Sequence, residues 1–149
     1  MTKISLKVTN TDAVMQAIRQ YGQKAEVELS KAVNATALTI NGEIKKMIQS
    51  PPKTGTIYNS RGKRHQASAP GEAPATDTGT LVSSITYKQE SPLVATVSSR
   101  LPYAYYLEFG TKKGGKTHIE PRPAWVPATE KNRDLFNKLV DAALRRAAQ

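Results

Sequence analysis

The sequence contains no cysteine and only two histidines, His65 and His118, among its 149 residues. Without cysteine the chain can form neither a disulfide nor a thiolate-based zinc or redox site. The first residues lack the apolar run of a secretory signal, and no stretch of about 18 apolar residues could cross a membrane. We therefore expect a soluble protein that is made in the cytoplasm and has no membrane contact.

Acidic residues are scarce relative to basic ones. The 12 aspartates and glutamates are outnumbered by 22 lysines and arginines, which gives a net charge of +10 at pH 7. Such an excess is typical of proteins that meet nucleic acid, a membrane surface or an acidic protein face, but it also describes an ordinary solvated surface. The basic residues are spread along the chain, with two local groups in segments that predict loops: Arg61, Lys63 and Arg64 in the first, and Lys112, Lys113 and Lys116 in the second.

The first third of the chain predicts a strand and then one long helix. Apolar and polar residues alternate over residues 4–8, which indicates a strand with one buried face. From Val14 to Met47 apolar residues recur every three or four positions, as on one face of a helix more than about 50 Å long. Gly22 and Gly42 weaken this helix locally and predict a kink or break near either one. The two prolines after position 50 end it.

The next segment, residues 51–78, is rich in proline and glycine and has almost no apolar periodicity. It predicts a flexible loop, either a mobile surface loop or one that orders only against a partner. Asp77 or Thr78 is expected to cap a short helical turn that follows the loop. Alternating residues then predict two strands, at 85–90 and 93–99, joined by a tight turn.

The last third predicts a short helix at 103–109, a second basic loop at about 111–120, and a helix from about 129 to 147. Taken together, the elements predict one domain, residues 1–149, of the α+β class. In this fold the long N-terminal helix and the C-terminal helix pack on a small antiparallel sheet made of residues near 4–8, 85–90 and 93–99. The two loops rich in proline, glycine and lysine extend from it.

Two apolar pieces flank the second basic loop. Residues 103–111 read Y-A-Y-Y-L-E-F-G-T, and residues 120–128 read E-P-R-P-A-W-V-P-A and carry the only tryptophan, Trp125. Tyr103, Tyr105 and Tyr106 could stack on nucleotide bases, but a short helix is a poor stacking platform, and we interpret them as core and interface residues. The proline-rich return would hold the loop on a packed base.

Some short patterns are typical of enzymes, but the residues around them lack the structure that each pattern requires. Residues 110–117 fit the phosphate-loop pattern G-x-x-x-x-G-K-[ST], but Pro121 and Pro123 exclude the helix that must follow it. A metal site from His118, Glu108 and Glu120 can be imagined, yet no helical pair of histidines supports it. No serine lies in a nucleophile elbow. We therefore expect no catalytic residue, no metal site and no cofactor.

Three pieces of the sequence occur in an order that resembles a family of tailed-bacteriophage neck, tail-completion and minor tail component proteins. They are T-G-T-L-V-S-S-I at 78–85 with the proline-rich segment before it, Y-A-Y-Y-L-E-F-G-T at 103–111, and P-R-P-A-W-V-P-A at 121–128. The resemblance covers nearly the whole chain. Trp125 stands about where the family often has phenylalanine, which keeps an aromatic residue there.

The resemblance implies a structural virion protein, made in the cytoplasm of the host bacterium, that joins head to tail or completes the tail. The implied partners are further copies of the chain in a ring, often sixfold, and other neck and tail proteins such as the head connector and the tail terminator or tube. Heterologous ring contacts need buried anchors. The candidate interface residues are Ile57, Tyr58, Tyr103, Tyr105, Glu108, Phe109, Arg122 and Trp125.

Two hypotheses go with this reading. The six loop cations Arg61, Lys63, Arg64, Lys112, Lys113 and Lys116 would contact viral DNA in the channel, or an acidic partner ring. Glu108 and Arg122 would form an ion pair that fixes the base of the loop. The alternative function is a sequence-independent DNA-binding protein that uses the same basic loops.

Overall fold

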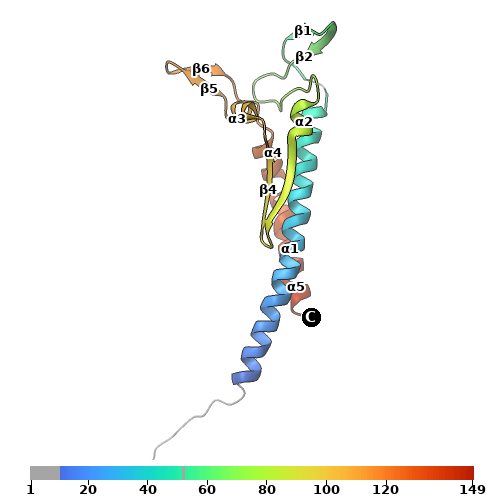
Figure 1. Ribbon diagram of the computed structural model, residues 1–149, viewed down its shortest axis with the longest axis vertical. Coiled ribbons are helices and arrows are strands. Elements are labelled where there is room, and N and C mark those ends of the chain that lie inside the picture. The colour runs from blue at the N-terminus through green and yellow to red at the C-terminus, as the bar shows by residue number, and fades with distance from the viewer. Residues whose placement is uncertain (1–10, 52) are drawn as a thin grey trace, which may run out of the picture.

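The long helix is the axis of the molecule. The computed structural model describes residues 11–51 and 53–149, so the predicted strand at 4–8 lies outside the described residues. Helix α1 (Thr11–Gln49) runs unbroken through Gly22 and Gly42, and Figure 1 shows it spanning most of the long dimension. The break expected at the glycines is absent, because one glycine costs a helix only about 1 kcal/mol.

The strands of the described residues form three separate antiparallel hairpins, two of which the sequence did not predict. Each is a two-stranded antiparallel sheet, and they comprise β1 (Ile57–Ser60) with β2 (Lys63–Gln66), β3 (Ile85–Ser91) with β4 (Val94–Ser99), and β5 (Thr111–Lys113) with β6 (Lys116–Ile119). The β3–β4 hairpin confirms the strands expected at 85–90 and 93–99. It lies along α1, whereas the other two hairpins project from the end of the molecule opposite the N-terminal turns of α1 (Figure 1).

Both segments predicted as plain loops therefore contain a hairpin. The turns explain why: Arg61 and Gly62 have φ of 51° and 75°, and Gly114 and Gly115 have φ of 58° and 77°. Two successive residues at positive φ give a turn whose twist matches that of antiparallel strands. The strands themselves are polar and mostly exposed, so the alternation by which strands are recognised is missing from the sequence.

Four shorter helices complete the fold: α2 (Thr80–Ser84), α3 (Pro102–Phe109), α4 (Trp125–Lys131) and α5 (Arg133–Ala147). Helix α3 confirms the helix expected at 103–109. The expected C-terminal helix begins earlier, at Trp125, and is divided at Asn132, whose buried side chain donates to the carbonyl of Ala128 at 2.8 Å. Helix α2 begins after Gly79, so neither Asp77 nor Thr78 is its N-cap residue, although the Thr78 hydroxyl accepts the backbone N–H of Thr80, the first residue of α2, at 3.4 Å.

The core is small and rich in alanine. Its largest fully buried side chains are Ile44, Ile48 and Ile85, and among the described residues nine of the thirteen buried aliphatic residues are alanines. This cluster lies where the second half of α1 meets α2, β3, α3 and α4. Small side chains let helices approach closely but bury little apolar area each, so polar contacts carry more of the cohesion.

Ion pairs join the C-terminal helices to α1. Arg146 Nε of α5 lies 2.6 Å from Glu28 Oε2, and Lys131 Nζ of α4 lies 2.5 Å from Glu43 Oε1. Helix α5 runs beside the middle of α1, and the C-terminus lies well short of the first turns of α1 (Figure 1). Among the described residues, no helix is both long and apolar enough to span a bilayer.

Candidate functional site

Helix α3 has an unusual distribution of side chains. Its inward side carries Ala104 and Glu108, four residues apart, and both are buried. Its outward side carries Tyr105 and Phe109, which are 64% and 58% exposed, with ring centroids 4.9 Å apart. The tyrosines were expected to be core and interface residues. The structure places them outside the core: Tyr103, Tyr105 and Tyr106 are all exposed, whereas Ala104 of the inward side packs in the core cluster.

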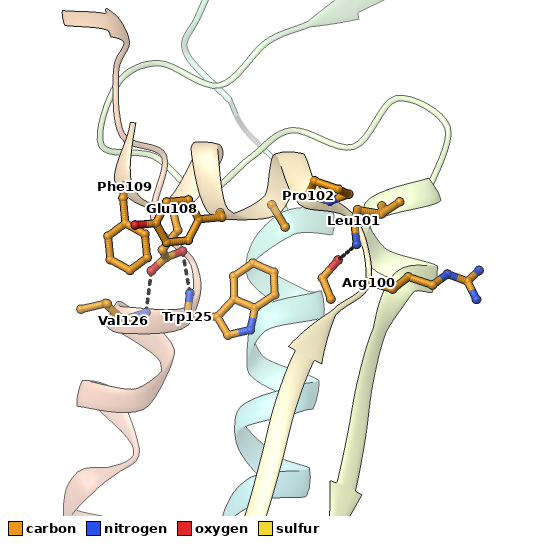
Figure 2. Close-up of a pocket in the computed structure, with 10 residues that line it drawn as sticks. Arg100, Leu101, Pro102, Glu108, Phe109, Trp125 and Val126 are labelled. Atoms are coloured by element: carbon orange, nitrogen blue, oxygen red, sulfur yellow. Dashed lines mark hydrogen bonds between the residues drawn. The ribbon is translucent and has the colours of Figure 1, made fainter. Parts of the chain in front are cut away.

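A hollow of about 410 Å³ lies between this aromatic row and the start of α4. Figure 2 shows Leu101 and Phe109 along one side, with Trp125 and Val126 facing them, and the Arg100 side chain extending away; Tyr105 also lines the hollow. The apolar residues lining the α3–α4 groove are Leu101, Pro102, Ala104, Tyr105, Phe109, Trp125 and Val126. Trp125 is partly buried against the core, and its indole Nε1 donates to the carbonyl of Val97 at 3.3 Å.

Glu108 connects the two walls of the groove. Its carboxylate accepts backbone N–H groups from Ala124 at 2.7 Å, Trp125 at 3.1 Å and Val126 at 2.8 Å (Figure 2 draws the last two). These are the free amides at the N-terminus of α4, where a negative charge is also favoured by the helix dipole. The predicted Glu108–Arg122 ion pair is therefore wrong: the carboxylate is bound by amides.

Arg122 has a different role at the same junction. Its guanidinium donates to the carbonyls of Ser68 at 3.2 Å and Glu120 at 3.1 Å, and its backbone N–H donates to Leu107 at 2.6 Å. Arg122 thus ties the segment after α3 both to α3 and to the proline- and glycine-rich segment. The two apolar pieces that flank the second basic loop thus meet at its base as anticipated, but through backbone groups.

Gly110 completes the turn after α3. It has φ of 71°, and a Cβ added there would lie 2.5 Å from the carbonyl oxygen of Ile119. Only glycine fits a positive φ with the backbone of β6 so close. Each residue of the E-F-G piece therefore has its own place: Glu108 caps α4, Phe109 is exposed, and Gly110 lets the backbone pass close to Ile119.

The segment 51–78 is held to the body at defined points. Lys53 Nζ donates to the carbonyls of Met47 and Ala73, and this partial burial lowers the pKa of Lys53. The Glu72 carboxylate accepts Thr54 Oγ1 at 2.5 Å and the amides of Thr54 and Ala69. The bond from the Thr54 hydroxyl, followed by those amides, holds the pKa of Glu72 below its ordinary value.

The other predicted interface residues lie on or beside the β1–β2 hairpin. Tyr58 and Tyr103 line a second hollow of about 280 Å³ together with His65 and Arg122. Tyr58 stacks edge-on with His65, with centroids 5.1 Å apart. Ile57 is exposed on the same hairpin and lines neither hollow. Of the eight predicted residues, four therefore line the α3–α4 groove, three line the second hollow, and Ile57 lines neither.

The six predicted basic contacts all lie exposed on the two projecting hairpins. Lys113 and Lys116 face each other across the β5–β6 turn, and Lys63 follows the β1–β2 turn at Arg61–Gly62. The residues after Gly115 form a strand, so no helix N-terminus stands behind the sequence that fits a phosphate loop. Within residues 11–51 and 53–149 no three acidic or histidine side chains gather into a metal site.

Sequence reasoning missed part of the site. Leu101, Pro102 and Val126 line the α3–α4 groove but were not among the candidates. Their positions next to Tyr103 and Trp125 were the only available signal, because a groove depends on how two helices are placed. The apolar residues on the first turns of α1 were likewise predicted as part of one continuous stripe, and the pattern gave no sign that Val14, Ile18 and Tyr21 are exposed.

An apolar, aromatic groove on a rigid base is the kind of surface that contacts other proteins. A comparison with protein families agrees with that class. The family model described as "Bacteriophage HK97-gp10, putative tail-component" matches residues 12–110, which is more than half of the chain. The chain belongs to this family of bacteriophage tail components, which confirms the resemblance. The searches of curated proteins and of solved structures found no match to the chain.

Proposed function

We propose that the protein is a structural virion component that acts in head–tail joining or tail completion. It associates with copies of itself in a ring and contacts neighbouring neck and tail proteins. The family supports the tail assignment. The observation that carries the proposal is the exposed aromatic row on α3 beside an apolar groove, because such surfaces are seldom left bare in a protein that acts alone.

The surface suits assembly for a physical reason. Helix α3 and the start of α4 are fixed to each other by the three bonds to Glu108. The aromatics therefore lose little conformational freedom when a partner covers them, which favours binding. Tyrosine, tryptophan and phenylalanine are the residues enriched at the centres of protein interfaces.

The most direct test is the mass of the purified protein, alone and mixed with the tail and neck proteins encoded beside it. We expect a ring, or a defined complex with one of those proteins, at micromolar concentration. A protein that remains monomeric alone and in every mixture would contradict the proposal.

A second candidate function, sequence-independent DNA binding, is favoured by the two basic hairpins. Each carries three exposed cations, and both project from one end of the molecule (Figure 1). In a ring, these cations could face the DNA that passes through, attracting phosphates without reading sequence.

This candidate is tested by replacing the six hairpin cations with glutamine. Binding to plain duplex DNA should weaken. The slope of log K against log salt concentration should become shallower by about 0.9 for each lost phosphate contact. A matched control replaces six exposed cations on the helices, namely Arg19, Lys24, Lys46, Arg133, Lys138 and Arg145. Equal effects of both sets would show that only net charge matters and would contradict a hairpin-specific site.

A further inference from the structure

The first turns of α1 carry an apolar face with no partner among the described residues. Every described side chain from Asp12 to Lys24 is exposed, and these turns extend past the rest of the molecule (Figure 1). Val14, Ile18 and Tyr21 are spaced four and three residues apart, so they share one side of the helix. We call these three residues the ridge.

The ridge continues a face that is buried further along the same helix. Ala25 follows Tyr21 by four residues and Ala32 follows seven later, and both are buried where α5 lies beside α1. The pair of Arg146 with Glu28 marks that contact. The ridge therefore has the pattern of a packing face. At a constant 100° per residue, the charged residues Asp12 and Arg19 lie on the opposite side.

The ridge and the α3–α4 groove match in shape and length. The groove is concave, and its α3 wall consists of Leu101, Tyr105 and Phe109, which follow one another at intervals of four residues and span roughly 12 Å. From Val14 to Tyr21 the ridge spans roughly 10 Å. Laying an apolar helix face into an apolar groove is a common mode of recognition.

Two copies repel each other least where they meet through surfaces without free charges. Each copy carries a net charge of +10, so contact between copies is opposed most where cations lie close together, and the ridge and the groove avoid such pairs. The ridge has no charged residue. In the groove the carboxylate of Glu108 is occupied by amides of its own chain, and Arg100 extends away (Figure 2).

We infer that the ridge of one copy packs into the α3–α4 groove of the next copy. This inference rests on the proposed function, since it names the contact by which copies associate. Because the ridge and the groove are different surfaces, each copy can bind one neighbour through its ridge and another through its groove. Such heterologous contacts close into a ring or continue as a filament, whereas ridge-to-ridge pairing would stop at a dimer.

Two variants test the inference. The ridge variant, Ile18→Ser with Tyr21→Ser, and the groove variant, Tyr105→Ser with Phe109→Ser, should each associate at least about tenfold more weakly than the wild type. Mixed in equal amounts they should form a two-copy complex and nothing larger, because only one intact ridge and one intact groove can meet. The readout is mass by native mass spectrometry or sedimentation.

The matched control lies on the same helix. Val27 and Leu38 are 56% and 52% exposed, close to the 61% of Ile18, but lie on the side of α1 away from the ridge. Val27→Ser with Leu38→Ser should assemble like the wild type.

A cross-link gives a second readout, because the chain has no cysteine of its own. Ile18→Cys mixed with Phe109→Cys should form a disulfide between copies on oxidation, and Val27→Cys mixed with Phe109→Cys should not. Suppose that the wild type assembles. If mixing the ridge variant with the groove variant then restores no complex, or if the groove variant alone still assembles, the inference fails and the proposed function stands. If the wild type binds neither itself nor any tail protein, both fail.

Discussion

The two sides of α3 reverse the usual arrangement of an amphipathic helix. The inward side holds Glu108 and Ala104, and the outward side holds Tyr105 and Phe109. Three backbone hydrogen bonds stabilise the inward carboxylate in its buried position. The rings of the outward Tyr105 and Phe109 lie against each other, with centroids 4.9 Å apart. Helix α3 is therefore held in place by polar bonds, and its large apolar side chains remain available for contact.

The same contrast holds for the molecule as a whole. Alanine dominates the buried apolar residues, while tyrosine, phenylalanine, leucine and valine side chains are prominent among the exposed ones. A protein whose stability depended on its aromatics would hide them. We therefore expect substitutions on the inner side of α3 to affect folding, and substitutions on the outer side to affect association.

The largest loss of stability should come from Glu108→Ala. Removing the carboxylate leaves three amides at the start of α4 without this acceptor, one buried and two partly buried, which should cost roughly 3 kcal/mol. For a chain of this size the melting temperature should fall by roughly 6–12 °C. The control is Glu130→Ala, which removes an exposed carboxylate from α4 itself. Equal melting temperatures for the two variants would show that the cap is unimportant.

Gly110→Ala should have the next largest effect. The new Cβ would lie 2.5 Å from the carbonyl oxygen of Ile119 at a φ of 71°, and relieving this clash should cost roughly 1–3 kcal/mol. Gly42→Ala provides a control of opposite sign. It lies within α1 with nothing within 4 Å, so alanine should stabilise the helix by up to about 1 kcal/mol. Chemical denaturation of both variants measures the difference.

A smaller effect concerns pH. Hydrogen bonds hold the pKa of Glu72 below its ordinary value, with the Thr54 hydroxyl contributing most. A lowered folded-state pKa means that the stabilisation is complete above the unfolded-state pKa of about 4.3, and is lost as pH falls through the folded-state pKa. Glu72→Gln should therefore melt at a lower temperature than wild type at pH 7, and the gap between the two should narrow as pH falls below about 4.3. A constant gap across that range would contradict this assignment.

The smallest change in stability is expected on the outer side of α3. Tyr105→Ser with Phe109→Ser removes side chains that are more than half exposed, so the free energy of unfolding should change by no more than about 0.5 kcal/mol per site. Denaturation measured under conditions where the wild type is monomeric separates folding from association. A loss comparable to that of Glu108→Ala would mean that the aromatics belong to the core.

The parts of the fold that the sequence predicted are those with a repeating pattern. The periodicity from Val14 to Met47 predicted α1, and alternation predicted β3 and β4. The β1–β2 and β5–β6 hairpins were missed because their strands are short and polar and their turns depend on backbone φ values. The strand predicted at residues 4–8 stays a prediction.

The site was predicted in part for a similar reason. Aromatic density drew attention to Tyr105, Phe109 and Trp125, but periodicity could not show which side of α3 faces α1. Opposite charge suggested a Glu108–Arg122 pair, whereas in the structure three amides from a distant helix start bind Glu108. Backbone groups are present at every residue, so the sequence carries no sign of which ones will meet a side chain.

The central claim is that the aromatic side of α3 serves contact between molecules and not the stability of the fold. Its most direct test is the mass, at one protein concentration, of wild type and of Tyr105→Ser with Phe109→Ser. We predict a multi-copy species for the wild type and a folded monomer, with an unchanged circular dichroism spectrum, for the variant. An identical assembly from both proteins would contradict the claim.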